Sequence, residues 1–423
     1  MPTITDLPCE VVASILRNLD SLQSLLRSLL VCRHFYSSMK ESSGVEATIV
    51  QQQITPALLP YSVAVMEASR LPYPRIEDSV RNLLDTLFHE PAQLTSRVRT
   101  MPRRLIGIMA RTHDVVHRLA TDFATDSWAR LSQADASSAS KSLSLSPAEY
   151  FRFCRALYQV ELFYSLFRGE PGDSTGTFEE SMNPWFFSRQ PPWENEQLGC
   201  VQEFLEAKLA EASLDVVAHE VEFGEFSIDY LTVGGDNHWR QLWLAQGIGF
   251  TYQLMNASSY DVKQALLTSG SDGGRANLPE ALAGVFEADP EDVILEDYSE
   301  EEIQSLVLLG DDTDTDMGPY ESWRAAHYDL PRADWLMLSD DAWLRERAYV
   351  LWDLERIQTH HLLELFGGSP QSPGPVYHDE DLEEMQESFD ERSNIWQRGG
   401  SGYWSKGDYS MIVWPSQSEE KSA

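Results

Sequence analysis

The residues with the most evident capacity for chemistry are three aspartates in the segment GDDTDTDMG. Asp312, Asp314 and Asp316 alternate as in the first half of an EF-hand loop, where carboxylate oxygens bind calcium. The sixth position of such a loop requires glycine but is Met317 here, and the twelfth requires a bidentate glutamate but is Trp323. The pattern therefore predicts a solvated acidic loop and no calcium site.

Two adjacent histidines, His360 and His361, are the second candidate for metal chemistry. Successive residues of an α-helix point about 100° apart, so neighbours are poorly placed to share one metal ion. Both lie late in an expected helix, where a protonated imidazole suits the negative end of the helix dipole. We interpret them as charges at a helix end, and the sequence predicts neither a metal nor a cofactor.

No other pattern of catalytic residues is present. The chain contains no GxSxG, HExxH, P-loop or Rossmann fingerprint. Its four cysteines, Cys9, Cys32, Cys154 and Cys200, are far apart and form no CxxC pair, which argues against zinc binding and for a reducing compartment. We nominate no catalytic residue and expect a protein that is not an enzyme.

The charge of the chain limits its partners. The 423 residues include 67 acidic and 32 basic side chains, a formal charge of −35, and such a surface repels nucleic-acid phosphates. The densest basic cluster, Arg97, Arg99, Arg103 and Arg104, has no interleaved aromatic residues and is typical of a solvated turn. No apolar run reaches the ~18 residues that span a bilayer, and no signal peptide is evident. We therefore expect no nucleic-acid or membrane binding, and a cytoplasmic or nuclear location.

The elements that would position functional residues are expected to be mainly α-helical, and no repeat of fixed period is present. One helix start is clear, because Ser146 is a candidate N-cap, Pro147 suits the first helical position and Glu149 completes a capping box; Gly169 is the expected stop. Further helices are expected near 57–70, 76–89, 105–131 (one helix or two), 196–219, 238–256, 260–268, 278–288 and 379–396.

Three other segments give specific expectations. A helix is expected to begin at Ser339-Asp340-Asp341 and to run to Phe366. The segment 221–233 alternates in places and weakly favours a strand. The Pro- and Gly-rich segment 170–195 is expected to be a loop. Its aromatic residues belong either to an interface or to packing of the loop against the body; they are Trp185, Phe186, Phe187 and Trp193.

The first 41 residues contain three short amphipathic segments. Thr5 or Asp6 can cap the first helix, and Asp20 or Ser21 can cap the second. The apolar faces comprise Val12, Ile15, Leu16 and Leu19, then Leu22, Leu25, Leu26 and Leu29, then Cys32, Phe35, Tyr36 and Met39. Helices this short cannot bury all these residues against one another, so the unit needs another surface, from this chain or from a partner.

This segment resembles the F-box family. The motif LPxExxxxIL…L…LL…VCRxFY is carried by Leu7, Pro8, Glu10, Ile15, Leu16, Leu19, Leu25, Leu26, Val31, Cys32, Arg33, Phe35 and Tyr36. The sequence departs from the family pattern in two places. Phe35 stands where many members have Trp, and Leu29-Leu30 replace a small or polar residue before the Val-Cys pair.

The resemblance implies a three-helix unit that docks on the Skp-type adaptor of cullin–RING ubiquitin ligases. The implied adaptor-binding residues are Leu7, Pro8, Val12, Ile15, Leu16, Leu19, Leu22, Leu25, Leu26, Val31, Cys32, Phe35 and Tyr36. The expected function is a non-catalytic, substrate-recruiting subunit whose partners are the adaptor, cullin through the adaptor, and an unidentified substrate protein. The alternative is an F-box scaffold or regulator that acts outside the ligase.

The expected organisation is an F-box followed by an irregular multi-helix body. We place the F-box at 1–45, a helical region at 46–131, a Ser/Ala-rich linker at 132–146, a helical body at 147–398 and a tail at 399–423. The segment RERAYVLWDLERI (345–357) resembles a stretch in the C-terminal part of large fungal F-box proteins of unassigned function. Apolar residues in and beside it are expected in the core; they are Trp343, Leu344, Leu351, Trp352, Leu354 and Ile357.

Overall fold

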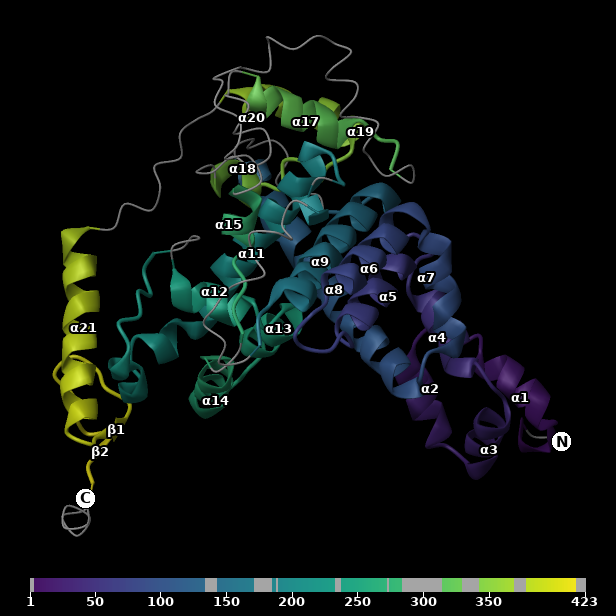
Figure 1. The fold of residues 1–423 in the computed structure, drawn as a ribbon, viewed down its shortest axis with the longest axis horizontal. Helices are drawn as coiled ribbons and strands as arrows, with labels where there is room; N and C mark the ends of the chain where they lie inside the picture. Colours follow the sequence, from purple (N-terminus) through teal and green to yellow (C-terminus); the bar gives the residue numbers. More distant parts are fainter. Residues whose placement is uncertain are drawn as a thin grey trace.

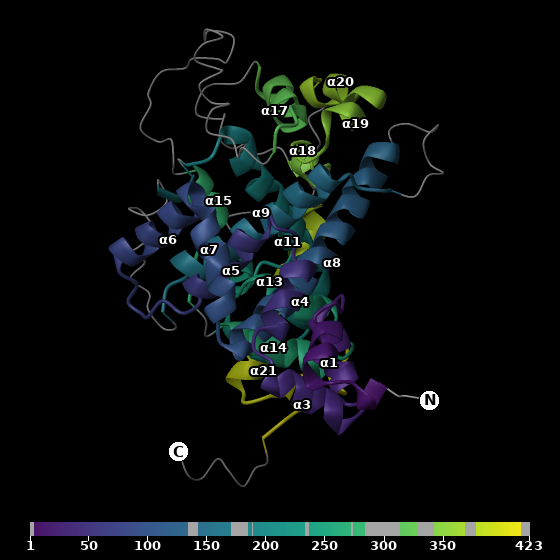
Figure 2. The ribbon, with the colours of Figure 1, turned by 90° about the vertical axis from the view of Figure 1, so that its right-hand side faces the viewer.

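The chain folds into a helical arch. The computed structural model describes residues 4–133, 143–170, 185–187, 189–232, 237–271, 274–283, 314–328, 342–368 and 378–415. Within these ranges the only strands are the antiparallel pair β1 (Ser401–Gly402) and β2 (Ile412–Val413), which confirms the mainly α expectation. The N-terminal helices form one foot of the arch and α21 (Asp379–Gln397) lies at the other (Figure 1). Both feet also lie at the bottom of the perpendicular view (Figure 2).

The N-terminal foot is the expected three-helix unit. It comprises α1 (Cys9–Leu16), α2 (Leu22–Leu29) and α3 (Arg33–Glu41), preceded by the 3-10 turn η1 (Ile4–Asp6). The chain continues through α4 (Val45–Gln53), α5 (Leu59–Ala68), α6 (Glu77–His89), α7 (Pro91–Arg97), the 3-10 turn η2 (Val98–Thr100) and α8 (Arg103–Gln133). The segment for which the sequence allowed one helix or two is thus a single helix, α8.

Two long helices, α9 (Pro147–Phe167) and α11 (Pro192–Val217), lie at the centre of the arch. The start of α9 confirms the predicted capping box. The Ser146 hydroxyl accepts a hydrogen bond from the Glu149 N–H at 3.0 Å, and the Glu149 carboxylate accepts one from the Ser146 N–H at 2.9 Å. The helix ends at Phe167, two residues before the expected stop at Gly169.

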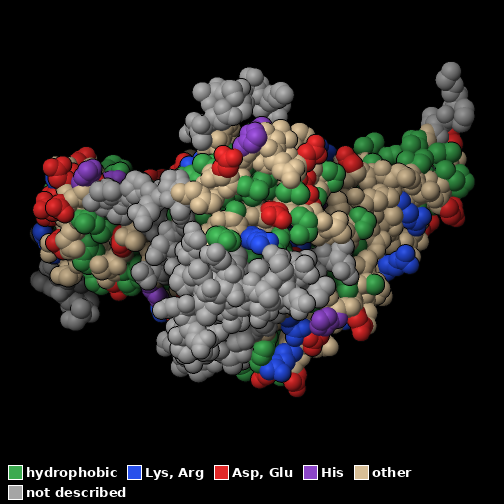
Figure 3. Space-filling model, turned by 90° about the horizontal axis from the view of Figure 1, so that it is seen from above, with side chains coloured by type: hydrophobic (Ala, Val, Ile, Leu, Met, Phe, Trp, Pro, Cys, Tyr) green, Lys and Arg blue, Asp and Glu red, His purple; other side chains and the backbone are tan. Residues whose placement is uncertain are grey.

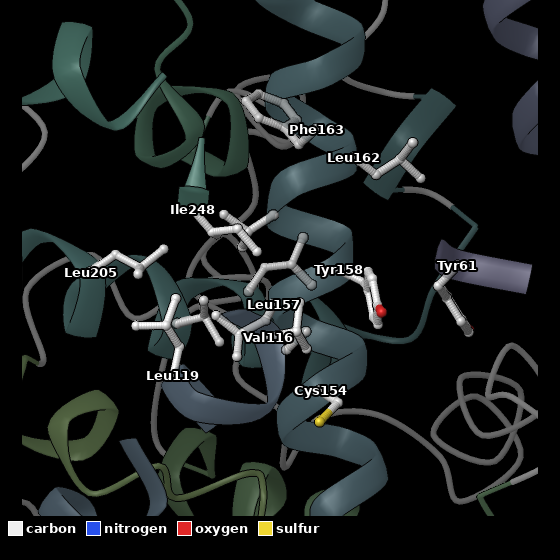
Figure 4. Close-up of a cluster of buried hydrophobic side chains, with 14 of the residues drawn as sticks. Tyr61, Val116, Leu119, Cys154, Leu157, Tyr158, Leu162, Phe163, Leu205 and Ile248 are labelled. Carbon is white, nitrogen blue, oxygen red and sulfur yellow. The ribbon is translucent and has the colours of Figure 1, made fainter. Parts of the chain in front are cut away.

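Side chains from four helices meet along one side of α9 (Figure 4). Leu157 of α9 lies among Val116 and Leu119 of α8, Leu205 of α11 and Ile248 of α13 (Ile248–Met255), and each is at most 1% exposed. This main core continues from α4 to the last helix before α21, so helices on both sides of the 132–146 segment contribute to it. Residues 134–142 of the predicted linker lie outside the described residues.

The remaining helices cover α11 and form the top and second foot of the arch (Figure 1). They are η3 (Val221–Glu225), α12 (His238–Leu244), α14 (Tyr260–Ser271), α15 (Leu278–Ala283), α17 (Gly318–His327), α18 (Ala342–Glu346), α19 (Leu354–Thr359) and α20 (Leu362–Gly367). The acidic helix expected near 379–396 is confirmed as α21.

The prediction of one long helix from Ser339 to Phe366 is wrong for the residues of this segment that the structure describes. The chain there forms three short helices, α18, α19 and α20, and Ser339-Asp340-Asp341 lie outside the described residues. Ala348 adopts a φ of 52° and ends α18, and His361 adopts a φ of 53° between α19 and α20. A continuous helix would bury one face, whereas the tight turn after Ala348 places four successive side chains in the core. These are Tyr349, Val350, Leu351 and Trp352, each 0% exposed, as the sequence predicted for Leu351 and Trp352.

Two further expectations need correction. The segment 221–233 begins as the 3-10 turn η3 and forms no strand in its described part, because Gly224 packs directly against the backbone of Arg392 in α21. The helix expected over 238–256 is divided into α12 and α13 at Gly247. Gly247 has a φ of 94°, a conformation that favours glycine.

The aromatic residues of the 170–195 segment pack against the body, in the part of that segment that the structure describes. Phe186 and Phe187 are buried beside Phe163 of α9, and Trp193, in the first turn of α11, is also buried. Trp185 lies partly buried beneath the Arg81 guanidinium, 3.6 Å from its ring centre. The packing alternative is therefore confirmed for Phe186, Phe187 and Trp193, and Trp185 is packed in part.

Candidate protein-docking site

The three N-terminal helices build a small core of their own. Val12, Ala13 and Leu16 of α1 and Leu25 of α2 are each at most 2% exposed. Two residues of α4, Val45 and Ile49, complete this core. Partly buried residues surround it, namely Leu7, Leu19, Leu22, Leu29, Phe35 and Met39. A fourth helix of the same chain, α4, thus completes the small core of the three-helix unit.

Local interactions fix the ends of these helices. The Ser21 hydroxyl accepts a hydrogen bond from the Ser24 N–H at 3.2 Å and caps α2, as one of the two predicted alternatives. The His34 ring Nε2 lies 2.9 Å from the Leu7 carbonyl oxygen, which ties the segment before α1 to α3. Gly44 has a φ of 78° and allows the sharp turn from α3 into α4.

Several large apolar side chains of the unit remain exposed after this core has formed. Leu30 is 88% exposed, Val31 72% and Leu26 62%. We call the exposed set the N-terminal apolar face; it comprises Ile4, Val11, Ile15, Leu26, Leu30, Val31 and Tyr36. Hydrophobic atoms gather at this end of the molecule in the view from above (Figure 3). Exposed apolar groups concentrated in one small unit mark a protein-interaction surface.

The implied adaptor-binding residues fall into three groups. Val12, Leu16 and Leu25 lie inside the core and hold the shape of the unit. Half-buried positions are taken by Leu7, Leu19, Leu22, Cys32 and Phe35. Exposed positions, where a partner has direct access, are taken by Pro8, Ile15, Leu26, Val31 and Tyr36.

Sequence reasoning missed three exposed apolar residues of the face, Ile4, Val11 and Leu30. Leu30 was noted only as a departure from the family pattern. It lies four residues after Leu26, so helical spacing groups it with a residue that was expected on the apolar face of this helix. Its exposure is shown by the packing of α2, which buries Leu25 and leaves Leu26 and Leu30 outside the small core.

Helix α4 fixes the unit to the body. Val45 and Ile49 enter the small core, whereas Ala47 and Val50 enter the main core. Polar contacts add to this attachment. Arg103 pairs with Glu46 at 3.3 Å, and the Gln53 amide donates to the Asp114 carboxylate at 2.8 Å. The orientation of the apolar face is therefore set by a helix packed on two sides.

The acidic segment that imitates an EF-hand has a structural role. Asp312 lies outside the described residues, but Asp314 and Asp316 are not a solvated loop as expected. Both pair with the fully buried Arg152 of α9, at 2.6 Å and 3.3 Å, and Asp353 pairs with it at 2.8 Å. Burial opposes the charge of Arg152, but the hydrogen bond and charges of these carboxylates outweigh burial and raise its pKa.

The other candidates for chemistry are also structural. The His360 ring packs edge-on against Trp128, with centroids 4.9 Å apart, whereas His361 precedes α20. Cys154 is fully buried, and burial raises the pKa of its thiol to about 12, which makes it a poor nucleophile. Within the described ranges, no group of three or more His, Cys, Asp or Glu side chains is placed to hold a metal. None of the helices in those ranges is long and apolar enough to cross a bilayer.

Comparison with known proteins agrees with the geometry of the N-terminal unit. The family model described as F-box-like matches residues 4–42, which span η1 and α1–α3. No curated protein and no solved structure shows significant similarity to the chain. The three helices, their closed core and this match together identify an F-box-like domain at residues 4–42 of the chain.

Proposed function

We propose that the protein is a substrate-recruiting subunit of a cullin–RING (SCF-type) ubiquitin ligase, which binds a Skp-type adaptor through the N-terminal apolar face. One observation carries the proposal. The F-box-like domain folds around its own core and still leaves Leu26, Leu30 and Val31 more than half exposed. Water contact with such residues is unfavourable by about 25 cal/mol per Å² of apolar surface, so a protein that covers them gains stability.

In this role the protein catalyses nothing itself. It raises the effective concentration of a bound target near the conjugating enzyme, which is a proximity effect. A rigid connection between the adaptor site and the body serves that purpose, because the orientation of the body then fixes where a target is held. The shared helix α4 supplies such a connection.

The test measures adaptor binding by calorimetry with two double variants of the full chain. In Leu30→Asp/Val31→Asp, two charges are placed on the apolar face, outside the small core. In the control Leu214→Asp/Val262→Asp, the same charges are placed on α11 and α14, where both residues are about half exposed. We expect the first variant to lose about 100-fold or more in affinity and the control to bind normally.

Co-purification then separates a ligase subunit from a scaffold. A ligase subunit retains cullin together with the adaptor, and loses both in Leu30→Asp/Val31→Asp. Equal adaptor binding by the two double variants would contradict the proposed site. Retention of the adaptor without cullin would favour an F-box scaffold outside the ligase.

A further inference from the structure

The second foot of the arch is a small unit with a core separate from the main one. Its core consists of Val221 of η3, Ile395 of α21, Trp404 and Ile412 of β2. Arg392 of α21 is fully buried and donates to the Glu220 carbonyl at 3.2 Å. Two further hydrogen bonds join this unit to the residues that follow α11. The Ser388 hydroxyl donates to the Ala218 carbonyl at 2.7 Å, and the Trp404 N–H donates to the His219 carbonyl at 2.9 Å. The unit is therefore held firmly to the body.

The strand β2 is apolar on both faces. Ile412 points into the small core and is 9% exposed, whereas Met411 and Val413 on either side are 63% and 66% exposed. Trp414, the next residue, is 42% exposed, and the Arg398 guanidinium lies 4.8 Å from its ring centre. Alternate residues of a strand point to opposite faces, and the outward face of a half-buried strand is normally polar. An outward apolar face therefore needs a partner to cover it.

One edge of β2 is also open to a partner. Among the described residues, β2 pairs with β1 alone, and β1 continues into a bridge between Tyr403 and Glu220. The far edge of this two-residue strand has no neighbouring strand in that part of the chain, and the Ile412 N–H donates to the Tyr409 carbonyl at 3.1 Å. Such an edge is a template for pairing with an extended segment of another polypeptide.

An acidic helix borders this apolar surface. The 19 residues of α21 include eight acidic side chains and one basic side chain, the buried Arg392. The hairpin touches this acidic side at two points. Tyr409 donates to Glu391 at 3.0 Å, and Lys406 pairs with Glu387 at 2.5 Å. Acidic side chains gather at this end of the molecule in the view from above (Figure 3).

We propose that the outer face and free edge of β2, bordered by the acidic side of α21, form a docking surface for a basic, extended polypeptide segment that carries apolar residues. The apolar side chains of the segment cover Met411 and Val413, and its lysines and arginines face the acidic side of α21. Charge complementarity favours a basic occupant, because α21 carries eight acidic side chains and one basic side chain. If the proposed function holds, this surface receives the ligase target, and it lies on the opposite foot of the arch from the F-box-like domain.

The test uses the full chain and a fluorescently labelled peptide in which lysine alternates with valine. Binding is measured by anisotropy for the wild type and for Met411→Lys/Val413→Lys, which changes only outward-facing residues. The matched control, Leu214→Lys/Val262→Lys, adds the same charge at exposed apolar positions on α11 and α14. We expect the β2 variant to lose about tenfold or more in affinity and the control to lose less than about twofold.

Two other peptides separate strand pairing from general attraction to an acidic protein. We expect a peptide with glutamate in place of lysine not to bind, and a backbone N-methylated form of the lysine–valine peptide to bind much more weakly. Equal affinity of the two double variants would overturn the proposal, as would undiminished binding of the N-methylated peptide. A shortened chain that ends at Pro415 and binds the peptide more tightly would show that the chain's own residues 416–423 occupy the surface instead.

Adaptor binding is measured on the same preparations, so that a failure of the proposed ligase function can be told apart from a failure of the proposed docking surface. Loss of peptide binding in Met411→Lys/Val413→Lys with normal adaptor binding supports a distinct docking surface. Wild-type protein that binds the peptide but no adaptor would overturn the ligase function and leave the docking surface intact.

Discussion

Ile49 and Val50 are consecutive residues of α4 that belong to two different cores. Ile49 closes the small core of the F-box-like domain, Val50 lies in the main core of the body, and both are 0% exposed. Neighbours on a helix point about 100° apart, so one short helix can serve two cores at once. Domain and body are therefore joined by a shared element, with no free linker between them.

The first prediction concerns the independence of the F-box-like domain. A fragment of residues 1–44 lacks Val45 and Ile49 and so lacks part of its own core. We expect it to be poorly ordered alone and to gain helix when the Skp-type adaptor is added, because a unit this small needs a further surface. Circular dichroism with and without adaptor measures this. A monomeric, fully helical fragment without adaptor would show that α4 is not needed.

The second prediction compares two neighbours on α2. Leu25 is 1% exposed and lies in the small core, whereas Leu26 is 62% exposed on the apolar face. We expect Leu25→Ala to reduce the free energy of unfolding by about 2–4 kcal/mol. We expect Leu26→Ala to leave the melting temperature unchanged and to weaken adaptor binding by about 1–2 kcal/mol.

Thermal unfolding and calorimetry on the same two proteins check the comparison. Each variant is the other's control, since the chemical change is identical and only the position differs. If Leu26→Ala lowers the melting temperature as much as Leu25→Ala does, then Leu26 supports the fold and the apolar face is misplaced.

The parts of the fold set by local signals were predictable from the sequence. The capping box of Ser146 and Glu149 and the cap at Ser21 depend on residues three positions apart, which a sequence shows directly. The turn at Ala348 carries no such signal. An alanine with positive φ is stabilised only by the burial of the residues that follow it, which is a tertiary effect.

The candidate site was partly predictable for the same reason. Periodicity identified the apolar residues of the three helices but could not separate Leu25 from Leu26, since both fit a broad helical face. Which of them lies inside depends on how α2 packs against α1 and α4. The outward face of β2 was missed entirely, because only the pairing with β1 and the packing of Ile412 show that Met411 and Val413 face outward.

The third prediction concerns the buried arginine of α9. Arg152 is fully buried and holds Asp314, Asp316 and Asp353. We expect Arg152→Ala to reduce the free energy of unfolding by about 3–5 kcal/mol, because it leaves buried or half-buried carboxylates without their counter-charge. The control Arg104→Ala, at an exposed position in the first turn of α8, should change it by less than about 0.5 kcal/mol.

Denaturant titration measures both variants. Calcium provides a separate check on the same residues, since a cation site and an arginine clamp exclude one another. We expect millimolar calcium to leave the melting temperature of the wild-type protein unchanged. A calcium-dependent rise would restore the EF-hand interpretation of the segment.

The last prediction is a pH dependence set by Glu161 of α9. Its carboxylate accepts a hydrogen bond from the Ile248 N–H at 2.8 Å, but burial dominates and raises its pKa from 4.5 to about 7. Between these two values the folded chain keeps the proton while the unfolded chain releases it. The unfolded state then binds fewer protons, so the free energy of unfolding falls as pH rises through this range. The contribution of Glu161 to the free energy of unfolding is fully present below about pH 4.5 and is lost above about pH 7.

Glu161→Gln removes this titration and keeps a side-chain oxygen that can accept the Ile248 N–H. As pH rises from 5 to 7, we expect the free energy of unfolding of the variant to increase by on the order of 1–3 kcal/mol relative to that of the wild type. Denaturant unfolding of both proteins at several pH values measures the difference between them, which cancels the titration of all other groups. A difference that stays constant over this range would show that Glu161 is ionised in the folded protein throughout, and that the N–H of Ile248 and the nearby Arg168 outweigh its burial.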